Sequence, residues 1–145
     1  MDFSDAVTVL RSIPIFAKVD PAELKLLAFA SKSVTFEDGE VLFQKGEPAD
    51  CAYLVHQGEV EVVVESGGRE LVVANLGKND LLGEMGIFTN SPRSASARAK
   101  GKLSVMCIEG DMFLRAVTEN PDAALSVMRA LCEKIADTTD LLYRG

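Results

Sequence analysis

The stretch EVEVVVESGGRELVVANL, residues 59–76, decides the fold class of this chain. Val60, Val62 and Val64 alternate with glutamates, so one face of this segment is expected to be buried and the other hydrated. A Ser-Gly-Gly turn at residues 66–68 then closes a hairpin into the second half of the stretch. The pattern therefore predicts an antiparallel sheet.

The same period of two extends on both sides of the hairpin, over residues 33–109. Turns at Gly39, Gly46 and Gly58 divide the upstream part into short segments, and residues 103–107 supply a last alternating strand. Many short strands separated by glycine turns are typical of a β-roll or jelly roll, here expected to have eight strands.

Helix signals precede this region, in residues 1–32. Ser4 can cap a short helix that ends before Pro14, because the residue before a proline avoids the helical conformation. Asp20 and Pro21 fit the N-cap and the first position of a second helix.

Residues 110–145 return to a helical pattern, and Asn120-Pro121 is expected to open a long last helix. This helix carries an apolar stripe of Ala124, Met128, Leu131, Ile135, Thr138 and Leu142. The stripe is expected either to pair with the same helix of a second copy, which gives a homodimer, or to pack on the chain's own β-roll. We therefore predict a single domain, residues 1–145, that is mostly β with N-terminal helices and a long C-terminal helix.

Composition excludes several functional classes. The net charge of −7 argues against a nucleic-acid surface, and no apolar run approaches the roughly 20 residues of a membrane span. The acidic start lacks the order of a signal peptide, and three separated cysteines in apolar settings fit reduced, buried thiols. We expect a soluble cytoplasmic protein.

The inventory of reactive side chains predicts neither a metal site nor catalysis. His56 is the single histidine and precedes a predicted turn, so no cluster of metal ligands and no nucleophile–histidine pair can be assembled. Glu84 alone does not make an acid–base pair.

The stretch LGEMGIFTNSPRSAS, residues 82–96, carries the chemistry. Two glycines, Gly83 and Gly86, flank a short helical turn whose backbone N–H groups can form an anion site, and Arg93 can add a charge-assisted pair to phosphate. Glu84 would then accept from a sugar hydroxyl. The alternative from the residues alone is a Glu84–Arg93 salt bridge at a turn.

This stretch resembles the phosphate-binding cassette, here residues 83–96, of cyclic-nucleotide-binding domains. The nine-residue step from Glu84 to Arg93 matches the pattern of kinase regulatory subunits, and residues 46–62 also resemble the family's β-roll. The similarity to the bacterial cAMP receptors runs from about Leu10 to Leu142.

The resemblance implies a role for each matching residue. Glu84 would hold the ribose 2′-OH, Arg93 the cyclic phosphate, and Ser94 would add its hydroxyl and N–H. Backbone N–H groups of residues 83–86 would bind phosphate and sugar. The implied ligand contacts are Val62, Val73, Leu76, Leu82, Gly83, Glu84, Met85, Gly86, Arg93, Ser94, Ala95, Thr138 and Thr139.

Some of these positions have a second interpretation in which the residue does not contact a ligand. Val62, Val73 and Leu76 lie where the family places apolar contacts to the base, but they also fit an ordinary core. Thr138 and Thr139 match a hydroxyl pair that reaches the adenine in bacterial cAMP receptors, or they form an exposed pair without a role.

The implied function is a sensor that binds cAMP in preference to cGMP, without a further cofactor. The threonine pair favours cAMP, although Ala74 replaces a serine that the bacterial receptors place near the base. Binding would pass through the last helix to an effector protein or a second copy. Family regulators continue into a helix-turn-helix domain that this sequence lacks, so no direct nucleic-acid contact is expected. The alternative is a degenerate cyclic-nucleotide fold that acts as a ligand-free protein-interaction module.

Overall fold

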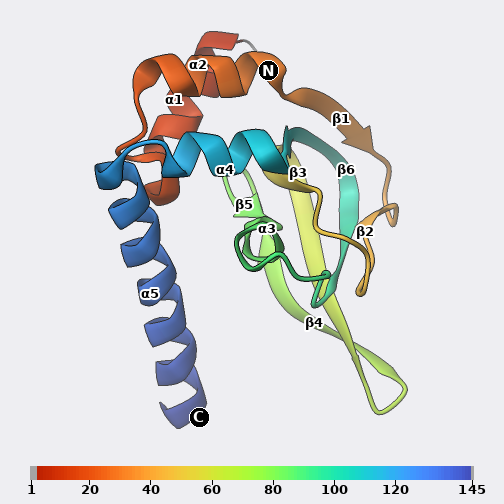
Figure 1. The fold of residues 1–145 in the computed structure, drawn as a ribbon. Helices are drawn as coiled ribbons and strands as arrows, with labels where there is room; N and C mark the ends of the chain where they lie inside the picture. The colour runs from red at the N-terminus through yellow and green to blue at the C-terminus, as the bar shows by residue number, and fades with distance from the viewer. Residues whose placement is uncertain (1–2, 145) are drawn as a thin grey trace.

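The computed structural model describes the backbone of residues 3–144 and the side chains of residues 5–133. The chain begins with helix α1 (Phe3–Ser12), the 3-10 turn η1 (Pro14–Phe16) and helix α2 (Pro21–Ala30), which lie together at one end of the molecule (Figure 1). The predicted start of α2 is confirmed, because Asp20 accepts a hydrogen bond from the Ala22 N–H at 3.1 Å. The predicted cap at Ser4 is wrong, because α1 already begins at Phe3 and Ser4 lies inside its first turn.

The described residues form one antiparallel sheet in which β1, β6, β3 and β4 are neighbours in that order. Short strands β2 and β5 pair with β6 and β3 respectively. The predicted hairpin is confirmed, since Ser66 pairs with Arg69 around two glycines with positive φ. The strands are β1 (Lys32–Phe36), β2 (Val41–Phe43), β3 (Cys51–Ser66), β4 (Arg69–Leu76), β5 (Leu81–Leu82) and β6 (Ser96–Glu109).

The sheet has six strands in the described residues rather than the expected eight, because β3 and β6 are long and continuous. Gly58 does not turn the chain; it lies within β3, where the register with β6 shifts on both sides of Gln57. Its φ is +98°, and a Cβ there would collide with the backbone oxygen of Lys102. The glycine signal therefore marks a bulge that bends one strand, and His56 beside it is a half-buried strand residue.

Two apolar clusters stabilise the fold. One joins the helices to the sheet and includes an edge-on contact between Phe16 and Phe113, with ring centroids 5.5 Å apart. The other fills the interior of the roll and includes Val60. The predicted alternation holds at Val60 but stops at Val63, which is buried on the opposite face of β3.

After β6 the chain forms α4 (Gly110–Thr118) and α5 (Pro121–Arg144). The predicted cap of α5 is confirmed by a 2.6 Å hydrogen bond from the Ala123 N–H to Asn120 Oδ1. The predicted apolar stripe packs on the chain itself only in part. Ala124 and Leu131 are half-buried and Leu131 packs against the core, whereas Met128 is 55% exposed. The buried face of α5 carries Ala123 and Val127 instead. Residues 134–145 of the stripe lie outside the described side chains.

Two further predictions concern burial. The expectation of three buried thiols is wrong for Cys132, which is exposed; Cys51 is buried and Cys107 half-buried. Among the described residues, no helix is both long and apolar enough to cross a membrane.

Candidate functional site

A left-handed glycine begins the helical turn of the cassette. β5 ends at Leu82, Gly83 has φ +84°, and helix α3 (Glu84–Thr89) follows. Gly83 offers no side-chain cap, so the first N–H groups of α3 have no side-chain acceptor at that position. A Cβ at Gly83 would lie 2.6 Å from Arg93 Nη1, so the missing side chain leaves room for the guanidinium.

Arg93 is the centre of this site, although only 5% of its surface is exposed. Its Nη1 donates to the Gly83 carbonyl at 2.7 Å and its Nη2 to the Cys51 carbonyl at 2.6 Å. The Nε–H is buried, and no described residue accepts a hydrogen bond from it. Both Nη groups of Arg93 thus donate to backbone carbonyls. The alternative of a Glu84–Arg93 salt bridge would require a carboxylate acceptor instead.

The backbone of Arg93 is also fixed. Its N–H donates to the Glu47 carbonyl and its carbonyl accepts from the Gly46 N–H, both at 2.8 Å. The segment after β2, which the sequence singled out for its family resemblance, therefore lies directly against the end of the cassette.

Aromatic side chains that the sequence analysis missed surround the guanidinium. The Phe43 ring centroid lies 4.2 Å from Arg93 Cζ, and Phe43 stacks on Tyr53 with centroids 5.9 Å apart. Tyr53 and Cys51 lie two residues apart on β3, so their side chains share one face of the strand, in the core of the roll. No pattern in the neighbouring sequence indicates that Phe43 lies near Arg93. Phe43 reaches the site because β2 pairs with β6, where Phe43 lies opposite Ala97.

Burial keeps these neighbours uncharged. Desolvation raises the pKa of the Cys51 thiol to about 12, and the pKa of the Tyr53 hydroxyl is raised by its burial and by its hydrogen bond to Cys51. At neutral pH both groups are protonated, so neither the thiol nor the phenol adds a charge to the site.

The structure brings several other predicted residues to the same region. Glu84 is 3% exposed at the first position of α3, and Leu82 is buried in the roll core beside it. Leu76 packs partly buried against the same core, and Val62 pairs with Ala97 on β6.

The structure does not bring the other predicted ligand contacts into the same region. Val73 is 56% exposed, because it is the extra residue where the register between β3 and β4 shifts. Met85 and Ser94 are exposed and Ala95 is half-buried. Gly86 packs tightly, since a Cβ there would meet Ala49 Cβ at 2.5 Å. The side chains of Thr138 and Thr139 lie outside the described residues.

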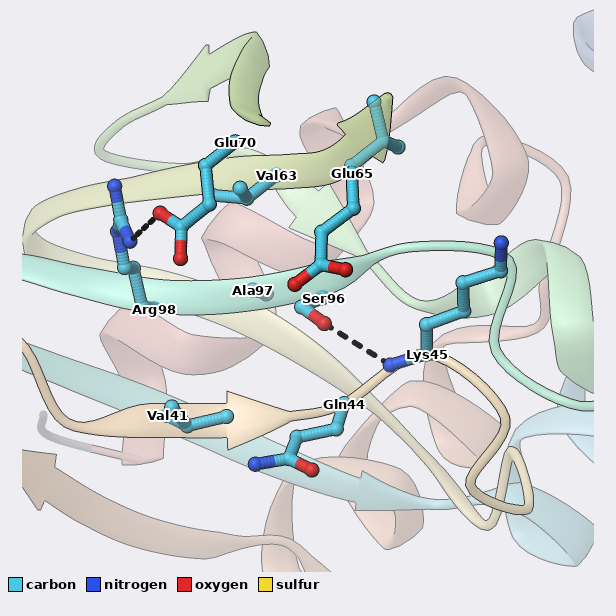
Figure 2. A pocket seen from close by; sticks show the side chains of 10 residues that line it. Val41, Gln44, Lys45, Val63, Glu65, Glu70, Ser96, Ala97 and Arg98 are labelled. Atoms are coloured by element: carbon cyan, nitrogen blue, oxygen red, sulfur yellow. Dashed lines mark hydrogen bonds and ion pairs between the residues drawn. The ribbon is translucent and has the colours of Figure 1, made fainter. Parts of the chain in front are cut away.

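A separate cavity of about 430 Å³ is lined by residues in and beside β2, β3, β4 and β6 (Figure 2). Arg98 in its wall alternates with the buried Ala97 and Ala99, so it faces away from the roll interior. Arg98 forms ion pairs with Glu61 at 3.1 Å and Glu70 at 2.6 Å. The cavity shares only Ser96 with the predicted cassette and is not the predicted ligand site; its lining is Val41, Gln44, Lys45, Val63, Val64, Glu65, Glu70, Ser96, Ala97 and Arg98.

Curated relatives resemble this chain over most of its length. The CRP-like cAMP-activated global transcriptional regulator of Mycobacterium tuberculosis is 27% identical over 135 residues, which span 92% of this chain and 60% of the relative. The cAMP-dependent protein kinase regulatory subunit of Yarrowia lipolytica is 37% identical over 73% of this chain but only 28% of its own length. The chain therefore corresponds to part of each of these proteins.

Solved structures show the same architecture. The sensor domain of the transcriptional regulator DNR from Pseudomonas aeruginosa superposes with a TM-score of 0.85, covering 95% of this chain and 93% of that chain at 23% identity, which speaks for the fold. The regulatory domain of Toxoplasma gondii PKA with cAMP gives a TM-score of 0.77 at 26% identity, covering 93% and 50%. A sequence model described as the cyclic nucleotide-binding domain matches residues 33–120, and the chain belongs to that family.

Proposed function

We propose that this domain binds cAMP, in preference to cGMP, at residues 83–96, with Arg93 as the phosphate partner. The observation that carries the proposal is the orphaned Nε–H of a guanidinium that is 5% exposed and bonded to Gly83 at the start of α3. A buried donor normally has an acceptor, and a cyclic phosphate supplies acceptor oxygens and a charge that matches the guanidinium.

The neighbouring residues suit the other parts of the ligand. Glu84 begins α3 directly after Gly83, whose carbonyl accepts from Arg93, and we assign it to the ribose 2′-OH. The N–H groups of residues 83–86 would share phosphate and sugar. Val62 and Leu76 offer an apolar surface to the base, while Val73 would have to contact it from an exposed position.

The preference for cAMP rests on the relatives and on two threonines. The M. tuberculosis regulator and the kinase regulatory subunits carry cAMP in their names, and one similar structure contains cAMP. Thr138 and Thr139 are proposed to reach the adenine, and Ala74 removes one polar contact to it.

We further propose that binding is relayed by α5 to an effector protein or to a second copy of the chain in the cytoplasm. The exposed side of α5, with Leu125 at 42% and Met128 at 55%, supports a partner there. The domain is proposed to act as a regulator without catalysis or cofactor.

Calorimetric titration with cAMP and cGMP tests the site. A ligand of about 22 non-hydrogen atoms at roughly 0.3 kcal/mol per atom gives a Kd near 10 μM. Arg93→Ala should weaken binding by about 2–4 kcal/mol, because the phosphate charge loses its partner. Arg98→Ala is the matched control, since it removes the same side chain from the opposite face of the sheet.

The two outcomes separate the functions. Loss of binding in Arg93→Ala with Arg98→Ala close to the parent supports the proposal, and an Arg93→Ala protein that binds within about threefold of the parent contradicts it. If the folded parent binds neither nucleotide, the chain is instead the ligand-free interaction module.

A further inference from the structure

Three sides of the Arg93 guanidinium are already occupied in this structure. The Gly83 carbonyl holds Nη1, the Cys51 carbonyl holds Nη2, and the Phe43 ring lies over Cζ at 4.2 Å. A guanidinium is planar and its donors have fixed directions, so two hydrogen bonds and one stacked ring define both its position and its plane.

Phe43 is itself held in place. It belongs to β2 opposite Ala97, and its ring stacks on Tyr53 with an interplanar angle of 28°. Tyr53 lies on β3 two residues after Cys51, whose carbonyl accepts from Arg93. The ring that covers the guanidinium is therefore fixed by the same strand that binds it.

This arrangement affects what a phosphate would find. A flexible arginine must lose side-chain entropy when it binds a ligand, whereas one held in advance does not. The negative face of an aromatic ring also stabilises a cation that has little contact with water. Both effects would increase affinity for an anion at the Nε–H, the donor that has no partner.

We propose that Phe43 is a positioning residue, which holds the Arg93 guanidinium ready for the cyclic phosphate through its ring. The inference rests on the proposed function, because it concerns the same site. It adds a determinant of affinity outside the cassette, in a strand that the cassette motif does not include.

The test compares cAMP affinity and thermal unfolding in three variants. Phe43→Leu should raise the Kd by about tenfold, because the cation–π contact and the fixed plane are lost. Phe43→Tyr keeps the ring and should bind within about threefold of the parent. Phe36→Leu is the matched control, since Phe36 packs against the same roll core without a ring contact to Arg93 among the described residues. It should lose stability but not affinity.

Each outcome decides between the role and its alternatives. If Phe43→Leu binds within about threefold of the parent, or Phe43→Tyr loses as much affinity as Phe43→Leu, the ring does not position the arginine. If Phe43→Leu does not fold, Phe43→Met removes the ring while keeping similar volume, and unchanged affinity there overturns the inference. If the parent itself does not bind, the proposed function fails, which is a separate result.

Discussion

Replacing Gly83 with alanine would place a methyl group 2.6 Å from Arg93 Nη1, on a residue with φ +84°. The left-handed backbone costs a non-glycine residue about 1–2 kcal/mol. The close contact adds little to this cost, because the guanidinium lies at the end of a flexible side chain and can move. Moving it, however, breaks the 2.7 Å hydrogen bond to the Gly83 carbonyl and takes the phosphate partner out of position.

Gly101→Ala isolates the backbone effect. Gly101 has φ +73°, and a Cβ there would have no atom within 4 Å. Gly101→Ala should lose about 1–2 kcal/mol of unfolding free energy, or roughly 2–8 °C in Tm for a domain of this size. Gly83→Ala should lose about 1.5–3 kcal/mol more, because Arg93 also gives up its hydrogen bond to the Gly83 carbonyl. Only Gly83→Ala should lose cAMP affinity, by about 1.5–3 kcal/mol, the usual contribution of a charged hydrogen bond.

Calorimetry and urea unfolding of the two variants decide the matter. If Gly83→Ala binds cAMP as tightly as Gly101→Ala, the observed guanidinium position is not needed for binding and the reasoning fails. If Gly83→Ala loses far more stability than the left-handed backbone and one charged hydrogen bond explain, the arginine does not yield, and its anchoring is stronger than two carbonyls and a ring suggest.

Three further predictions concern stability. Gly58→Ala should cost about 3 kcal/mol or more in urea unfolding, because its Cβ collides with the fixed backbone oxygen of Lys102; a loss near that of Gly101→Ala would contradict this. Asn120→Ala should lose about 1 kcal/mol by the same assay, since it removes the cap of α5, and an unchanged midpoint would show that the cap is unimportant. Burial and the charge of Lys78 hold the pKa of His56 below 6.5, so the unfolded chain binds the proton first and stability should fall as the pH drops below about 6.5. His56→Gln should flatten the pH profile in that window, and an identical profile would assign the slope to other groups.

The features predicted correctly from the sequence are those that depend on neighbouring residues. The hairpin needed only alternating valines and a glycine pair, and the starts of α2 and α5 needed only Asp20 and Asn120, whose hydrogen bonds reach two and three residues along the chain. The cassette glycines and Arg93 were also found locally, because one short stretch contains them all.

The features that were missed depend on contacts between distant segments. Gly58 looks like a turn, and only the position of Lys102, which lies on another strand, makes it a bulge. Phe43 and Cys51 reach Arg93 through pairing in the sheet, and nothing in their own segments indicates an arginine. The strand count and the surroundings of the guanidinium were therefore not predictable from local patterns.

Arg93 contributes to structure and to the proposed binding through different atoms. Removal of the whole side chain therefore changes stability and binding together. Nη1 joins the two ends of the cassette and Nη2 joins the cassette to Cys51 in β3, so Arg93→Ala breaks two hydrogen bonds that any form of this fold would use. A purely structural arginine would have every buried donor satisfied within the protein, yet the described residues supply no acceptor for the Nε–H, and α3 begins without a side-chain cap. The case for a ligand thus depends on Nε and on the N–H groups of α3. Variants that shift the guanidinium while leaving it in the molecule, such as Gly83→Ala, test that case more directly than deletion of the side chain.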